Sequence, residues 1–92
     1  IDRVIHMIGP KRHIYWVNTH VPTRNWETSV NKTIAKAAQR YPNVKVVDWH
    51  GLSKDQKSWF YGDNVHPNPT GNRNFTRLLV QRLTEPDSSS AK

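Results

Sequence analysis

The sequence predicts the α/β fold class, with a parallel sheet of which this chain holds only the C-terminal portion. Two short apolar, β-branched runs alternate with helical patterns along the 92 residues, which is typical of βαβ units. Two strands alone do not make a stable sheet covered on both faces, so further strands are expected in a preceding segment. The chain begins without Met and within a helical pattern, which we interpret as the start of an excised segment.

The first half of the chain is expected to form a helix, a strand and a second helix. An initial helix ends at Gly9 and Pro10, and its apolar face consists of Ile1, Val4, Ile5 and Ile8. Residues 13–17 form an apolar, β-rich run that predicts a buried strand. A helix over residues 26–40, with Asn25 as its N-cap, is predicted from an apolar stripe made of Trp26, Val30, Ile34, Ala37, Ala38 and Tyr41.

The second half is expected to add a strand, a long loop and a last helix. Residues 44–47 predict the second strand, which ends at Asp48. Residues 49–69 are predicted to be mostly loop, with a short helix near residues 53–57. Thr70 is the expected cap of the last helix, whose apolar face consists of Phe75, Leu78, Leu79 and Leu83. The polar residues 85–92 are expected to be a disordered tail, which leaves residues 1–84 as the domain portion.

Composition narrows the possible functions. The chain has no cysteine, which excludes disulfides, thiolate nucleophiles and zinc sites made of Cys. No apolar run reaches the ~18 residues of a membrane-spanning helix. Lys and Arg number 14 against 7 Asp and Glu, a formal charge of +7 that favours anionic surroundings. These basic residues are scattered and form no RNA-binding motif, so no nucleic-acid partner is predicted.

The chemistry is predicted in the loop after the second strand. Active sites of open α/β sheets lie at the carboxyl ends of the strands. In the run Tyr61-Gly62-Asp63-Asn64-Val65-His66-Pro67, a turn could bring the Asp63 carboxylate onto one imidazole nitrogen of His66. The other nitrogen would then face a serine hydroxyl, as in the His-Asp half of a Ser-His-Asp triad. Alone, an Asp and a His at this spacing are more often structural.

The sequence around this pair resembles a known family. Asp63, His66 and Pro67, followed by Gly71 and a helix, resemble the last block of SGNH hydrolases. The segments 14–22 and 46–49, with Trp26 and Val30-Asn31, are similar to the extracytoplasmic SGNH domain of A-type peptidoglycan O-acetyltransferases, and the similarity covers residues 1–84. This resemblance implies a three-layer, flavodoxin-like α/β/α fold with serine esterase or O-acetyltransferase chemistry and no cofactor. Asp63 and His66 would then be catalytic.

The resemblance also implies partners and a location. The domain would act on an acetylated glycan or an acetyl donor of the cell wall, at the extracellular face of the bacterial membrane, within a membrane-attached parent protein. The nucleophile would come from a Gly-Asp-Ser block in the upstream half of the same domain. No nucleophile is predicted in this chain, because Ser29, Ser53 and Ser58 lack a nucleophile-elbow context and are expected at the surface. We therefore expect the chain alone to be inactive.

Other polar residues have weaker assignments. Asn18 and Thr19 end the first strand at the catalytic edge, so they are candidate substrate-binding residues beside a plain turn role. His50 either lines the cleft or is solvated. Two carboxylates and two histidines could bind a divalent ion, but their spacing matches no compact motif and no metal is predicted: Asp48, His50, Asp63 and His66. The remaining histidines, His6, His13 and His20, are expected at the surface or at strand ends.

A different class of function is also compatible with the sequence. If no serine block precedes this chain, it would be a non-catalytic basic module held on anionic cell-wall polymer by its charge of +7. The upstream sequence discriminates between the two hypotheses, because a Gly-Asp-Ser block would decide for the enzyme.

Overall fold

The computed structural model describes residues 1–85. Its elements are α1 (Asp2–Ile8), β1 (Ile14–Val17), α2 (Glu27–Arg40), β2 (Val44–Val47), α3 (Trp49–Ser53), a 3₁₀ turn (Lys57–Trp59) and α4 (Pro69–Thr84). This order of helices and strands confirms the predicted α/β class. The predicted tail lies, except for Glu85, outside the described residues.

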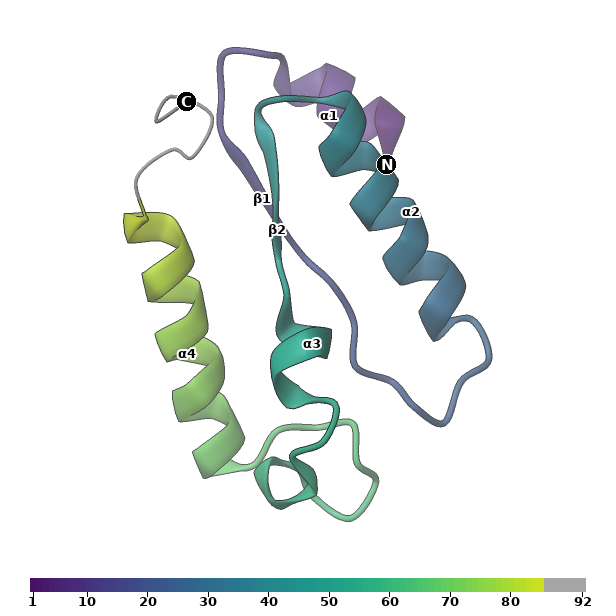
Figure 1. Cartoon of the computed structure of the whole chain (residues 1–92), viewed down its shortest axis with the longest axis vertical. Helices are drawn as coiled ribbons and strands as arrows, with labels where there is room; N and C mark the ends of the chain where they lie inside the picture. Colours follow the sequence, from purple (N-terminus) through teal and green to yellow (C-terminus); the bar gives the residue numbers. More distant parts are fainter. Residues whose placement is uncertain (86–92) are drawn as a thin grey trace.

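The two strands pair in parallel, as predicted, in a register that runs from Ile14 opposite Val44 to Val17 opposite Val47. Figure 1 shows α1 and α2 on one side of this sheet and α4 on the other. Arg82 ties α4 to the sheet, because its Nε donates to the carbonyl oxygen of Val46 at 3.0 Å. Both faces of the strand pair therefore carry a helix, although the sheet has only two strands within the described residues.

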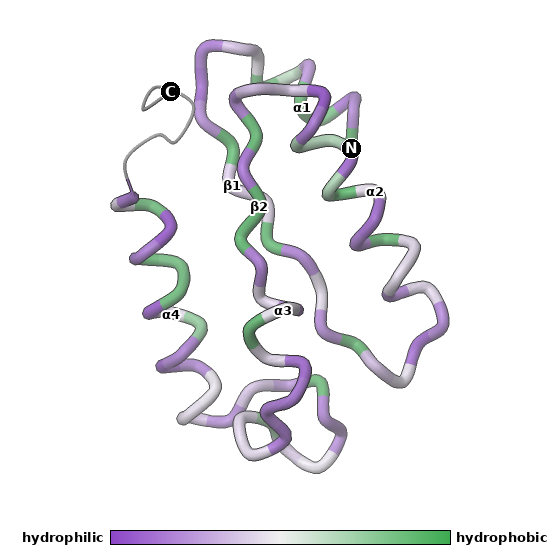
Figure 2. Tube along the Cα trace, in the orientation of Figure 1, coloured by the Kyte–Doolittle hydropathy of each residue, from purple (hydrophilic) through white to green (hydrophobic). Residues whose placement is uncertain are grey.

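Two groups of side chains fill the interior. Between α1, α2 and the strands lies an aliphatic cluster of Ile5, Ile14, Ala37 and Val44. Below β2, Trp49 contacts three other aromatic rings, with centroids 5.2–6.0 Å away: Trp59, Phe60 and Phe75. This aromatic cluster packs the segment predicted to be mostly loop against α4, and aromatic contacts of this kind are specific in geometry. Figure 2 shows the apolar positions along β1 and β2 and alternating polar and apolar positions along α2 and α4.

Three helix starts differ from the predictions. Helix α2 begins at Glu27 with Trp26 as its N-cap, so the prediction of Asn25 was wrong. Helix α4 begins at Pro69 with Asn68 as its cap, so the prediction of Thr70 was wrong. A short helix already starts at Trp49, before the predicted residues 53–57, because the Asp48 side chain accepts from the backbone N–H of Gly51 and caps it.

Parts of the predicted apolar faces remain open. In α1 only Ile5 is buried, while Val4 and Ile8 are 45% and 40% exposed. In α4, Leu83 is 50% exposed and the side chains of Leu78 and Leu79 are only half-buried. Trp26, placed by prediction in the stripe of α2, is 45% exposed. The helices are amphipathic as predicted, but the described elements are too few to cover their apolar faces.

Across residues 1–85, the helices lack the length and apolar character that crossing a lipid bilayer requires.

Candidate active site

The loops after β1 and β2 meet at one edge of the sheet. Asn18 directly follows β1 and Asp48 directly follows β2. The side-chain nitrogen of Asn18 donates to Oδ1 of Asp48 at 2.8 Å, and its side-chain oxygen accepts from the backbone N–H of His50 at 2.7 Å. This amide therefore joins the two strand ends at the edge where open α/β sheets bind their ligands.

The loop that leads into α4 brings Asp63 and His66 together. Nδ1 of His66 lies 2.5 Å from Oδ2 of Asp63. The other oxygen of Asp63 accepts from the backbone N–H groups of Val65 and His66 at 2.9 and 3.0 Å. The His66 side chain is 78% exposed. One ring nitrogen is therefore engaged by a carboxylate, while the ring as a whole remains accessible.

The turn around this pair is closed at its base. Phe60 and Pro67 form an antiparallel bridge, and the backbone N–H of Tyr61 donates to the carbonyl of His66 at 3.0 Å. At the tip, Asn64 has a φ of 57°, a left-handed conformation that Asn tolerates better than most residues. The loop therefore holds Asp63 and His66 through its own backbone bonds, independently of the side-chain contact.

Asn68 and Gly71 fix the turn against α4 and the 3₁₀ turn. The Asn68 side chain caps α4 by accepting from the N–H of Gly71 at 2.9 Å, and it donates to the carbonyl of Ser58 at 2.7 Å. Gly71 is buried, and a Cβ at this position would collide with the carbonyl oxygen of Trp59. A side chain is excluded there by close approach of the backbone, which explains the glycine that follows the His66-Pro67 pair.

Hydrogen bonds lower the pKa of Asp63 to about 2, first through the His66 side chain and then through the backbone N–H groups of Val65 and His66. The pKa of Asp48 is also lowered, mainly by the Asn18 side chain. Both carboxyl groups are therefore ionised at neutral pH. An ionised Asp63 can orient the His66 ring and stabilise its protonated form.

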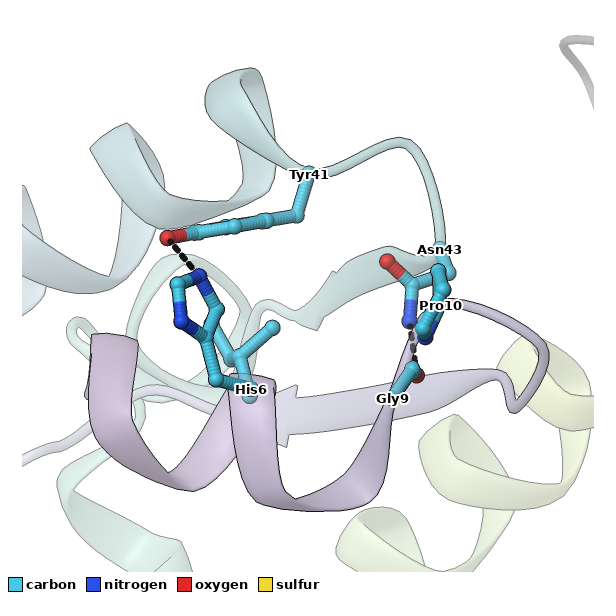
Figure 3. A pocket seen from close by; sticks show the side chains of 6 residues that line it. His6, Gly9, Pro10, Tyr41 and Asn43 are labelled. Atoms are coloured by element: carbon cyan, nitrogen blue, oxygen red, sulfur yellow. Dashed lines mark hydrogen bonds between the residues drawn. The ribbon is translucent and has the colours of Figure 1, made fainter.

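Two of the hollows in the structure lie at opposite ends of the molecule. One of about 300 Å³ adjoins the Asp63–His66 turn and is lined by Lys57, Phe60, Tyr61, Gly62 and Asn64. The other, of about 430 Å³, lies where α1 meets the start of β2, and Figure 3 shows His6 and Tyr41 facing each other across it, with Asn43 bonded to the Gly9 carbonyl. The first hollow adjoins the candidate catalytic turn, so of these two it is the better candidate for a substrate site.

The weaker candidates have different surroundings. Thr19 is turned toward α2, because its backbone N–H and its hydroxyl both donate to the side-chain oxygen of Asn31, at 2.8 and 2.9 Å. His50 lies beside the Asn18–Asp48 pair, with 33% of its side chain exposed. Within residues 1–85, no hydrogen bond joins Asn18, Thr19 or His50 to the Asp63–His66 pair.

Ser53, expected at the surface, and His20, expected at the surface or at a strand end, are both buried. His20 is only 5% exposed and its ring stacks on Phe60, with centroids 4.5 Å apart. Ser53 is fully buried, and its hydroxyl donates to the carbonyl of Trp49 at 2.6 Å. Both residues lie in segments that lack a regular apolar pattern, so their burial depends on the aromatic cluster. Ser29 and Ser58 are exposed, as expected.

Comparison with known proteins adds evidence that the fold alone does not provide. No family model matches the sequence. The chain is 42% identical over 73 residues to a putative peptidoglycan O-acetyltransferase of Bacillus subtilis, a match that covers 79% of the chain and 11% of that protein. It is 48% identical over 75 residues to a peptidoglycan O-acetyltransferase of Listeria monocytogenes, covering 82% and 12%. A putative O-acetyltransferase of Staphylococcus aureus matches at 41% identity over 66 residues, covering 72% and 11%.

The chain thus spans only 11–12% of the length of the curated relatives it matches. The similarity nevertheless extends over about four fifths of this chain for the first two relatives. Homologues of this chain therefore include proteins named peptidoglycan O-acetyltransferases.

Proposed function

We propose that this chain is the C-terminal portion of an SGNH-type serine O-acetyltransferase or esterase domain that acts on acetyl esters of cell-wall glycan. In this proposal Asp63 and His66 belong to a Ser-His-Asp triad, in which ionised Asp63 orients the ring and His66 transfers the protons. The observation that carries it is the 2.5 Å contact between Nδ1 of His66 and Oδ2 of Asp63, in a turn held by its own backbone bonds. The names of the homologues support the glycan and the acetyl group.

The geometry is suited to two proton transfers. Because Asp63 engages Nδ1 of His66, the neutral ring carries its proton there and presents a lone pair on Nε2. A serine Oγ that attacks the acetyl carbonyl would give its proton to Nε2, and His66 would pass that proton to the departing alcohol. In the second half, a sugar hydroxyl or water would give its proton to Nε2 and attack the acetyl-serine, and His66 would return the proton to the serine.

The serine and its oxyanion donors would come from the upstream half of the domain. Within the described residues, β1 pairs with a strand on one side only, so its other edge has backbone groups available for a preceding strand. The exposed faces of α1 and α4 would be covered by the same upstream half. The parent protein would be membrane-attached, with this domain on the extracellular face or in the cell wall.

Kinetics of the longer protein that includes the upstream half test this proposal. His66→Ala is expected to lower the turnover of a chromogenic acetate ester by about 10³-fold or more, because both proton transfers pass through His66. Asp63→Asn should cost roughly 10² to 10⁴-fold, since the amide favours the wrong tautomer. The matched control is His13→Ala, which removes an exposed imidazole remote from the turn and should leave turnover unchanged.

The 92-residue chain by itself should show no esterase activity, because it lacks a nucleophile elbow and oxyanion donors. Near-normal turnover in a folded His66→Ala protein would contradict the triad. Turnover by the isolated chain that a sulfonyl fluoride blocks would show that the nucleophile lies within these residues.

The charge of +7 favours a second candidate, a non-catalytic module that binds anionic cell-wall polymer. Such binding should weaken steeply with added salt and survive His66→Ala. A longer protein that binds the polymer in this way and has no Gly-Asp-Ser block upstream would favour this candidate over the enzyme.

A further inference from the structure

A second cluster of potential ligands lies apart from the Asp63–His66 turn. It consists of His20 in the loop after β1, Glu27 at the start of α2 and His50 in α3, each of which offers one atom within 4.8 Å of the others. Three different elements therefore contribute one side chain each to the same point. His20 and Glu27 come after β1 in the chain, and His50 comes after β2. Asn18 and Asp48 meet at the same carboxyl edge of the sheet.

The two histidines of this cluster have unsatisfied nitrogens. Both ring nitrogens of His20 and Nδ1 of His50 are buried without a hydrogen-bond partner among the described residues. His20 is only 5% exposed, and an imidazole always carries at least one polar N–H or lone pair that water would otherwise satisfy. Buried polar groups of this kind are rarely left without a partner, and a ligand that accepts electron pairs would satisfy these nitrogens.

Glu27 adds the charge that such a ligand requires. One of its carboxylate oxygens accepts from the backbone N–H of Val21, which fixes the side chain. The other oxygen lies 3.7 Å from Nδ1 of His50, too far for a hydrogen bond. An ion pair between Glu27 and a protonated His50 would leave both nitrogens of His20 unsatisfied, whereas a bound cation would engage all three side chains.

We propose that His20, Glu27 and His50 form a binding site for a divalent transition-metal ion of the Zn²⁺ class. Two imidazoles and one carboxylate are a common zinc ligand set that leaves a fourth position for water. In a tetrahedral zinc site the ligand atoms lie about 3.3 Å apart. The ligand atoms of the three side chains lie within 4.8 Å of one another, so they would have to approach by up to about 1.5 Å. The ion would tie the loop after β1 to α2 and α3. This inference goes beyond the proposed acetyl transfer and does not depend on it.

Calorimetric titration of the 92-residue chain with Zn²⁺, together with the visible absorption of added Co²⁺, tests the site. We expect one ion per chain, a Co²⁺ spectrum of four-coordinate type, and a higher melting temperature in Zn²⁺. His20→Gln and Glu27→Gln should each weaken Zn²⁺ binding by roughly 100-fold or more, since even outer-shell changes cost 10–100-fold. His13→Gln is the matched control and should bind like the unmodified chain, because His13 is exposed and outside the cluster.

The Zn²⁺ titrations of the chain and its variants also show which outcomes support the site and which overturn it. Should the chain fold only on addition of Zn²⁺, the gain of helical circular dichroism with one ion would support the site, because metal binding and folding are coupled. A chain whose circular dichroism shows folded helices and that binds no Zn²⁺ at millimolar concentration overturns the proposal and leaves an ordered water as the partner of His20. A chain that stays unfolded at millimolar Zn²⁺ overturns it as well, because a site of this strength would drive folding. Binding that survives both His20→Gln and Glu27→Gln, or that His13→Gln abolishes, overturns it as well.

Discussion

The carboxylate of Asp63 divides its two oxygens between the backbone and the His66 ring. Oδ1 accepts from two backbone N–H groups, and Oδ2 contacts Nδ1 of His66. The first oxygen fixes where the carboxylate lies, so the second can fix the tautomer and the orientation of the ring. The backbone conformation of the turn therefore depends on Oδ1 of Asp63, and the orientation of the His66 ring depends on Oδ2 of the same residue.

NMR titration of the side-chain carboxyl carbon of Asp63 tests this division of its hydrogen bonds. Its pKa, about 2, is lowered first by the His66 side chain and then by the two backbone donors. In His66→Ala the pKa should rise but stay below the ordinary 3.8, because both backbone N–H groups remain. Asp48, whose pKa Asn18 lowers, is the internal control and should not move.

The sign of the linked stability follows from the direction of the shift. Because the folded-state pKa of Asp63 is lowered, its contribution to stability is fully present above the ordinary value of 3.8 and is lost as the pH falls toward about 2. A pKa for Asp63 at or above 3.8 in the unmodified chain would contradict the contact with His66.

Local contacts could be predicted from the sequence, and distant ones could not. Asp63 and His66 are three residues apart between Gly and Pro residues, so a turn was enough to predict their approach. The surroundings of Thr19 and His20 depend on Asn31 and Phe60, which are 12 and 40 positions away. No periodicity in the loop after β1 indicates these partners, and the burial of His20 was therefore missed.

At the scale of elements, Asn68 joins the candidate catalytic turn to α4. Its side-chain oxygen caps the helix, while its nitrogen donates to the carbonyls of Ser58 and Phe60. The sequence could not distinguish this cap from Thr70, because both residue types are good caps and Pro69 suits the first helical position of either start.

Paired substitutions in the longer protein test the role of Asn68. Asn68→Ala should lower the free energy of unfolding by about 1–3 kcal/mol, because it removes a cap and the hydrogen bonds to the carbonyls of Ser58 and Phe60. Thr70→Ala should change it by less than about 0.5 kcal/mol, since Thr70 is exposed and not the cap. Urea denaturation measures both values. Equal losses for the two variants would contradict the assignment of the cap.

The elements themselves were largely predictable, and their boundaries less so. The stripe of α2 has the period of a helix, and the runs of β1 and β2 are short, apolar and rich in β-branched or aromatic residues, which predicts strands. The segment from Trp49 to Phe60 was predicted to be mostly loop because its aromatic residues follow no period. The structure shows that these rings contact one another and Phe75, so their order comes from tertiary packing.

For the whole molecule, apolar surface is the dominant feature that the described residues leave unexplained. Met7 is 80% exposed, and Val80 and Leu83 on α4 are 54% and 50% exposed. Of these three residues, only Leu83 belongs to an apolar face that the sequence predicted, and the sequence could not show which predicted faces the chain itself would cover. An apolar surface of this kind on a small domain indicates an interaction that buries it.

The isolated 92-residue chain is therefore expected to be poorly stable. Its core is small, because only eight hydrophobic residues of the described range 1–85 are buried: Ile5, Ile14, Ile34, Ala37, Val44, Val47, Trp49 and Phe60. A chain of this size already buries a smaller fraction of its surface than a larger domain. Within the described residues, the two-stranded sheet also has no neighbouring strand at either outer edge.

The stability of the isolated chain is measured by thermal denaturation, with circular dichroism and the binding of a hydrophobic dye as the two probes. We expect a broad, low-temperature transition and dye binding before it for the isolated chain. The longer protein should give a sharp transition without early dye binding, because its upstream half would cover α1, α4 and the edge of β1. Recording the transitions of both proteins in the presence of a chelator removes any contribution of a bound metal ion to stability. A sharp two-state transition from a monomer of the isolated chain would show that these residues form a complete domain, and the upstream half would then not be required for folding.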